Sequence, residues 1–128
     1  MDSRKRIFIS FAIEDVKYRD FLVGQARLHH CPFEFIDMSV KTPWDETEWR
    51  RRCSTKMRGC DGVIVLLSRH SYHSSGLRYE AKCAKADRIP MLGVHIHKND
   101  RGAALPELYR KKKVNWTWDN IANFVESL

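Results

Sequence analysis

Short apolar runs alternate with amphipathic segments along the 128-residue chain. The apolar runs predict strands at residues 6–11, 32–39, 62–68, 89–97 and 114–116. Apolar positions three and four residues apart predict helices at residues 14–28, 46–60, 74–87 and 118–128. The segment between the last two strands is polar, with room for one helical turn. Strand and helix therefore alternate from one end of the chain to the other.

The apolar stripes of these helices mark the faces that we expect in the core. The first two stripes are Val16, Phe21, Leu22 and Leu28, then Trp49, Cys53, Met57 and Cys60. The last helix has Thr117 as its expected N-cap residue, followed by Ile121, Phe124, Val125 and Leu128 at helical spacing.

This alternation predicts βαβ units joined by right-handed crossovers. The run 62–68 is almost continuously apolar, as in a strand that is buried on both faces. We find no internal repeat, low-complexity tract or linker. We therefore expect a single domain over residues 1–128, an α/β, flavodoxin-like three-layer sandwich around a mostly parallel sheet of about five strands.

In such sheets, ligands bind beyond the carboxyl ends of the strands, near the switch in strand order. This rule marks residues 11–14, 37–44, 68–80 and 95–99. The chain has no GxGxxG after its first strand and no GxxxxGK[ST], which argues against a bound redox dinucleotide. Ser68 and Arg69 stand where a phospho-receiver would need an acid, which argues against that class.

A hydrophobic fraction of 43% is sufficient for a core, and no apolar run approaches the roughly 18–20 residues that span a bilayer. The apolar stretch near the N-terminus is too short for a signal-peptide core. We expect a cytoplasmic protein without membrane contact. The net charge of +7 raises the alternative of nucleic-acid binding, but the basic residues are dispersed, so nucleic acid is not the expected partner.

The four cysteines, Cys31, Cys53, Cys60 and Cys83, show no CxxC or CxxH spacing, so we expect reduced thiols and no metal site. His95 and His97 lie two apart on a predicted strand and should face the same way. No third ligand is evident from spacing, which favours a polar strand end that lines the ligand cleft.

Trp44 lies in a loop at the expected ligand edge of the sheet. Its indole could stack on a base there or pack in the core. Both interpretations stay open.

Glu80 lies in the middle of the third predicted helix. Positions 76, 77, 83 and 84 are Gly, Leu, Cys and Ala, so an ion pair within the helix has no basic partner. At about 100° per residue, Glu80 lies about 60° from the apolar centre formed by Leu77, Ala81 and Ala84. This position is the margin between core and cleft, where either a functional carboxylate or a structural one with a distant partner would fit.

Four segments of the chain resemble TIR domains or TIR-like proteins. "RIFISFAIED" is similar to the first TIR box, and "GCDGVIVLLSRHSYHSSGLRYEAKCA" to the segment that leads into the helix with the catalytic glutamate. "PFEFIDMSVKTPWDE" and "WTWDNIANFVESL" resemble compact bacterial TIR-like proteins related to the TIR component of Thoeris anti-phage systems. The resemblance covers essentially the whole chain, and the order of the segments carries most of it.

The resemblance implies an enzyme that cleaves NAD, as a nucleosidase or cyclase, and makes an ADP-ribose-derived signal in anti-phage defence. NAD is then the substrate, and no cofactor or metal is needed. The implied partners are further copies of the chain, through TIR–TIR contacts, and a separate effector that senses the product.

The resemblance places Glu80 at the catalytic glutamate. It implies substrate contacts from residues at the strand ends, namely Phe11, Ala12, Asp37, Ser39, Trp44, Ser68 and Tyr79. Many TIR domains have a tryptophan a few residues before this glutamate, where this chain has Gly76 to Tyr79. Tyr79 is the candidate replacement for that aromatic wall. The missing tryptophan favours the alternative function, a non-catalytic TIR module that serves only as an interaction scaffold.

Overall fold

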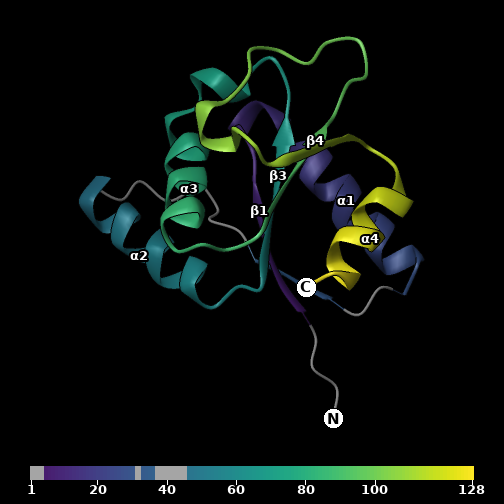
Figure 1. Ribbon diagram of the computed structural model, residues 1–128, viewed down its shortest axis with the longest axis horizontal. Helices are drawn as coiled ribbons and strands as arrows, with labels where there is room; N and C mark the ends of the chain where they lie inside the picture. Colours follow the sequence, from purple (N-terminus) through teal and green to yellow (C-terminus); the bar gives the residue numbers. More distant parts are fainter. Residues whose placement is uncertain (1–4, 31–32, 37–45) are drawn as a thin grey trace.

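The computed structural model describes residues 5–30, 33–36 and 46–128. Its sheet has five parallel strands in the order β2-β1-β3-β4-β5 (Figure 1). The strands are β1 (Lys5–Ser10), β2 (Phe33–Ile36), β3 (Gly62–Leu67), β4 (Met91–His95) and β5 (Lys112–Asn115). The order 2-1-3-4-5 confirms the expected flavodoxin-like α/β fold.

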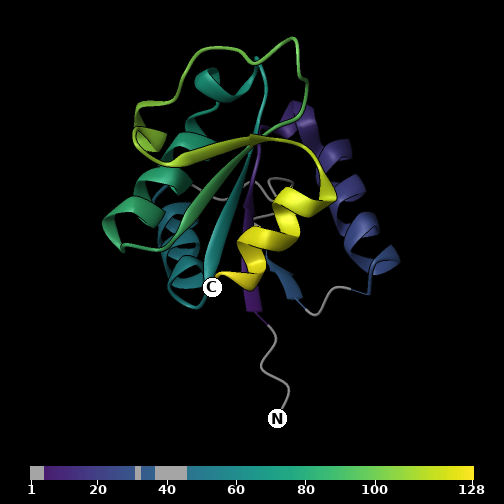
Figure 2. The same ribbon diagram turned by 45° about the vertical axis from the view of Figure 1, so that its right-hand side comes forward.

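Four α-helices cover the two faces of the sheet. They are α1 (Val16–Leu28), α2 (Glu46–Arg58), α3 (Ser75–Ala86) and α4 (Trp118–Glu126). Helices α1 and α4 lie on one face, and α2 and α3 lie on the other (Figures 1 and 2). Three short 3-10 turns follow β1, follow β3 and precede β5: η1 (Ile13–Asp15), η2 (Ser71–His73) and η3 (Pro106–Leu108).

The strand alternation divides the core into two clusters. Ile7, Ile9, Ile64 and Leu66 point toward α1 and α4, while Phe8 and Val65 are among the residues that pack with α2 and α3. Every residue of β3 is buried, as the continuous apolar run predicted.

Two helix starts are fixed by hydroxyl caps. The Ser74 hydroxyl accepts a hydrogen bond from the Leu77 N–H at 3.2 Å at the start of α3. Thr117 caps α4 in the same way, accepting from the Asn120 N–H at 3.1 Å, which confirms the predicted cap.

The first helix differs from the prediction. It begins as the 3-10 turn η1, and the α-helix starts only at Val16. Phe21 and Leu28 were expected in the core, and this was wrong, because their side chains are 61% and 76% exposed. Leu22 and Ala26, four residues apart, form the inward face instead, and Phe21 and Leu28 lie off that face.

Strand β4 is shorter than predicted. Pro90 has no N–H to donate to the ladder, and the Ile89 N–H bonds back to the carbonyl of Ala84 in α3 at 2.9 Å. Strand β5 begins two residues earlier than predicted, at Lys112. It forms an edge of the sheet with exposed Lys112 and Lys113, and charged side chains of this kind protect a sheet edge.

In the part of the chain that the structure describes, no helix is both long enough and apolar enough to cross a bilayer.

Candidate active site

The candidate site lies where β1 and β3 end side by side. The chain leaves β1 toward α1 on one face of the sheet and leaves β3 toward α3 on the opposite face (Figure 1). The connections after β1 and after β3 therefore diverge at this edge of the sheet. Ligands of open parallel sheets bind where neighbouring connections diverge in this way. Two cavities open there, and Glu14 lines both of them.

Glu80 projects from α3 into the smaller cavity. Its side chain is only 5% exposed, and its Oε1 accepts a hydrogen bond of 2.8 Å from the hydroxyl of Ser10. Ser10 is fully buried at the end of β1, on the face that packs against α3. The hydroxyl therefore holds the carboxylate in one orientation, with a buried bond that links α3 to the central strand.

The smaller cavity, here called the Glu80 cavity, has a volume of about 280 Å³. Its walls come from the segment after β1, from α2 and from the start of α3. The lining residues are Phe11, Ile13, Glu14, Trp49, His73, Ser74, Ser75, Gly76, Leu77 and Glu80. Aromatic and aliphatic side chains thus surround a carboxylate, with a second carboxylate on the opposite segment.

Trp49 is a wall of this cavity that the sequence analysis missed. It projects from α2, and its ring lies 3.6 Å from the point where a β-carbon on Gly76 would sit. A β-carbon at position 76 would sit in ordinary van der Waals contact with the indole, so α2 and α3 pack against each other at this point. Trp49 therefore gives the Glu80 cavity an aromatic wall from a different helix.

Only some of the residues that the resemblance implies as substrate contacts line the Glu80 cavity. Phe11 lines the Glu80 cavity, whereas Ala12 is fully buried beside it without lining it. Tyr79 faces α2, where its hydroxyl lies 3.4 Å from the Ser54 hydroxyl, and it does not line the cavity.

Four further residues complete the predicted set. Ser68 lines the second cavity rather than the Glu80 cavity. Asp37, Ser39 and Trp44 lie outside the described residues. The substrate-contact role of each residue in the set stays a prediction.

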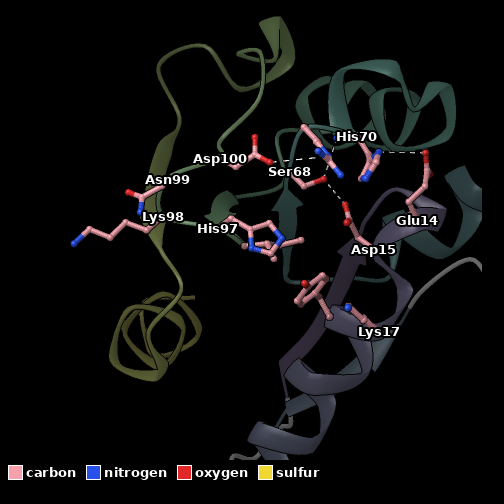
Figure 3. A pocket seen from close by; sticks show the side chains of 12 residues that line it. Glu14, Asp15, Lys17, Ser68, His70, His97, Lys98, Asn99 and Asp100 are labelled. Carbon is pink, nitrogen blue, oxygen red and sulfur yellow. Dashed lines mark hydrogen bonds and ion pairs between the residues drawn. The ribbon is translucent and has the colours of Figure 1, made fainter.

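The larger cavity, of about 680 Å³, lies between the start of α1, the end of β3 and the turn after β4 (Figure 3). We call it the His97 cavity. Its lining residues are Glu14, Asp15, Lys17, Tyr18, Ser68, Arg69, His70, Ile96, His97, Lys98, Asn99 and Asp100. Three acidic and three basic side chains are among them, so the cavity carries no strong charge of one sign.

A buried polar network joins the two strand ends behind these cavities. The Ser68 hydroxyl donates to Asp15 Oδ2 at 2.5 Å, and both residues are almost completely buried (Figure 3). The same hydroxyl oxygen accepts from the His70 N–H at 3.0 Å. At the surface, His70 Nδ1 lies 3.5 Å from a Glu14 carboxylate oxygen. Two polar contacts, Ser68–Asp15 and His70–Glu14, therefore connect the segments after β1 and β3.

His95 and His97 do not line the same cavity. His97 lines the His97 cavity, and its ring packs edge-to-face against that of Tyr18, with the two ring centres 5.2 Å apart. His95 lines neither cavity, and burial, reinforced by Arg101 and Lys113, lowers its pKa. The prediction that both histidines lie on one strand is wrong, because β4 ends at His95 and strand alternation does not extend to His97.

The described cysteines, Cys53, Cys60 and Cys83, are free thiols, and Cys31 lies outside the described residues. Burial raises the pKa of Cys53, and it raises the pKa of Cys60 to about 11, so both are protonated at neutral pH. Within the described ranges, no three His, Cys, Asp or Glu side chains cluster closely enough to hold a metal ion.

A comparison with protein families decides where this chain belongs. The model of the family described as "Thoeris protein ThsB, TIR-like domain" matches residues 8–101, which include both cavities. The chain is a member of this ThsB TIR-like family. No curated protein matches its sequence.

Solved structures agree with the ThsB TIR-like chain in fold. The SEFIR domain of interleukin-17 receptor B superposes with a TM-score of 0.68 at 13% identity, covering 95% of this chain and 93% of that one. A prokaryotic SEFIR domain gives a TM-score of 0.56 at 11% identity, with 96% and 88% covered. A 3-dehydroquinate dehydratase-like protein from Bifidobacterium longum gives 0.51 at 13% identity, with 98% and 94% covered. At these identities the likeness concerns the fold alone.

Proposed function

We propose that this ThsB-type chain cleaves the bond between nicotinamide and ribose in NAD, with Glu80 as the catalytic carboxylate. The observation that carries the proposal is a nearly buried glutamate, held by the Ser10 hydroxyl and facing a cavity at the ligand edge of the sheet. Burying a carboxylate costs free energy, and a hydrogen bond such as the one from Ser10 offsets part of that cost. Carboxylates that are buried in this way beside a cavity are typical of functional sites.

The chemistry suits one buried carboxylate. Nicotinamide leaves as a neutral molecule, so no acid has to protonate it, unlike the leaving group in ordinary glycoside hydrolysis. Positive charge develops on the ribose in an oxocarbenium-like transition state. A carboxylate fixed beside the ribose stabilises that charge, and it is most effective where water is excluded. The Ser10 hydrogen bond fixes Glu80 before the substrate binds, so that the carboxylate need not reorient during the reaction.

The walls of the Glu80 cavity suit the nicotinamide riboside end of the substrate. Phe11 and Trp49 offer aromatic surface for a flat ring. At about 280 Å³ the cavity lies just below the usual range of about 300–1,000 Å³ for ligand pockets, so it would enclose part of a dinucleotide. The phosphates and the adenosine would extend beyond it. We keep Asp37, Ser39 and Trp44 as proposed contacts for these outer parts.

Ala12, Ser68 and Tyr79 have supporting roles in this proposal. Ser68 fixes the wall after β3 through Asp15, and Tyr79 packs beneath Trp49 with ring centres 5.6 Å apart. Ala12 contributes only a buried methyl group next to Phe11 in the cavity wall.

Membership in the ThsB family implies a role in anti-phage defence. We propose that the product is an ADP-ribose-derived signal that a separate effector protein senses. We also propose self-association of the chain. Once nicotinamide has left, capture of the ribosyl cation by water, by the adenine of the same molecule or by another nucleophile would each give a different signal.

One observation favours the alternative, a module that only binds partners. Phe21 and Leu28 are large apolar side chains left exposed on α1, beside a groove of about 500 Å³. Exposed apolar surface of this kind is typical of interaction sites. The two functions are compatible in one chain, because the groove and the Glu80 cavity share no residue.

The deciding experiment incubates the purified protein with NAD at high protein concentration, with Glu80→Gln alongside, and separates nicotinamide and ADP-ribose products by mass-resolved chromatography. We expect nicotinamide release that falls by about 1,000-fold or more in the variant, as when a group that stabilises the transition state is lost. Equal release by both proteins would refute the role of Glu80. If neither protein cleaves NAD, even in cells challenged with phage, the interaction module is the correct function.

A further inference from the structure

Glu14 is a second carboxylate in the Glu80 cavity. It comes from η1 after β1, on the opposite wall from α3, and it also lines the His97 cavity. Its side chain is 53% exposed, in contrast to the buried Glu80. The two carboxylates that face one cavity therefore differ in environment, and such a difference separates two roles in catalysis.

Cleavage of NAD leaves one proton to remove. Loss of neutral nicotinamide needs no acid, but an oxygen nucleophile that captures the ribosyl cation must lose its O–H proton. Glu80 is poorly placed to take this proton because it is nearly buried and already accepts from the Ser10 hydroxyl. Glu14 faces the same space and is open to water.

On the basis of the proposed function, we propose that Glu14 is the general base for the oxygen nucleophile. Nicotinamide departs with the electron pair of its bond to C1′ of the ribose. The oxygen of water, or of a sugar hydroxyl, forms the new bond to C1′ and gives its proton to the Glu14 carboxylate. The product is ADP-ribose or an oxygen-linked derivative, and one proton remains on Glu14.

His70 completes the path of that proton. Its Nδ1 lies 3.5 Å from a Glu14 carboxylate oxygen, and its side chain lines the His97 cavity, which is the larger of the two (Figure 3). The His70 backbone N–H donates to the Ser68 hydroxyl, which anchors this part of the chain, and the imidazole lies beside Glu14. His70 passes the proton from the small cavity to the water of the large one.

The test separates nucleophiles that must lose a proton from one that has none to lose. A pyridine such as 3-acetylpyridine attacks C1′ with its ring lone pair and replaces nicotinamide without releasing a proton. We expect Glu14→Gln to lower hydrolysis of NAD by about 100-fold or more, the usual effect of losing a general base. The Glu14→Gln variant should still exchange the nicotinamide of NAD for 3-acetylpyridine at a rate close to that of the unmodified protein.

Three further variants complete the experiment. Glu80→Gln should lose both hydrolysis and exchange, because cleavage itself requires Glu80. His70→Asn should lower hydrolysis less than Glu14→Gln does and should leave exchange intact. Glu34→Gln is the matched control, because Glu34 is an exposed glutamate at β2 that lines neither cavity.

The outcomes distinguish this inference from the function on which it rests. If Glu80→Gln loses activity while Glu14→Gln hydrolyses NAD at the unmodified rate, only the role of Glu14 is refuted. If Glu14→Gln loses hydrolysis and exchange equally, Glu14 orients the substrate and is not the base. If the unmodified protein neither hydrolyses nor exchanges, both proposals fail.

Discussion

Helices α1 and α3, which cover opposite faces of the sheet, differ in how much apolar surface they leave exposed. On one face, α3 turns Leu77, Ala81 and Ala84 inward, all of them fully or almost fully buried. On the other face, α1 buries Leu22 and Ala26 but leaves Phe21 and Leu28 largely in solvent. Both helices are of similar length and flank neighbouring strands, so length does not explain the contrast.

The difference separates two kinds of surface. The α3 face is closed, and a carboxylate is fixed inside it by a buried hydroxyl. The α1 face is open, with apolar side chains around a groove that includes Tyr18 and Trp116. We infer that chemistry belongs to the closed face and association to the open one.

The largest expected effect is the difference in unfolding free energy between truncating a leucine of α3 and truncating one of α1. Leu77→Ala should lower the free energy of unfolding by about 2–5 kcal/mol, because it leaves a cavity in the core. Leu28→Ala should change it by about 0.5 kcal/mol or less, as for an exposed position. Urea unfolding of both variants measures the difference. Similar losses would show that α1 is packed as tightly as α3.

A smaller loss of unfolding free energy is expected from removing the buried hydrogen bond between Ser68 and Asp15. Ser68→Ala removes the hydroxyl that donates to the buried Asp15 carboxylate and should cost about 1–3 kcal/mol in unfolding free energy. Ser68→Thr keeps the hydroxyl and serves as the control in the same urea titration. An unchanged stability for Ser68→Ala would mean that the bond adds nothing to the fold.

The smallest effect on folding concerns the open face. Phe21→Glu should alter the unfolding free energy by about 0.5 kcal/mol or less, because the side chain is exposed. It should nevertheless reduce self-association, measured by sedimentation at several protein concentrations. Asp20→Asn, at the neighbouring exposed position, is the control. Association that is equal in all three proteins would exclude this face from the contact.

The sequence predicted the fold because the strands are strongly apolar and the chain alternates regularly. The all-buried β3 and the Thr117 cap are examples in which local pattern and tertiary structure agree. Phe21 and Leu28 show where the pattern misleads. Apolar type alone does not tell which side of a helix is covered, since that depends on where the sheet lies.

The candidate site was predicted through Glu80, because the sequence shows no basic residue three or four positions away from it in the helix. Trp49 and Ser10 were missed because they reach Glu80 from distant segments. Trp49 is visible in the sequence as part of the apolar stripe of α2, but only the packing of α2 on α3 shows that it reaches the Glu80 cavity. Ser10 could have been found from the alternation of β1, which turns Ser10 to the same face as Phe8.

The lysines of β5 have a consequence for assembly. A second copy that paired with β5 would place a strand beside the exposed Lys112 and Lys113, and charged side chains on an edge strand disfavour such pairing. Growth of the sheet from one copy to the next is therefore disfavoured at this edge, which favours copies that each keep their own five-stranded sheet.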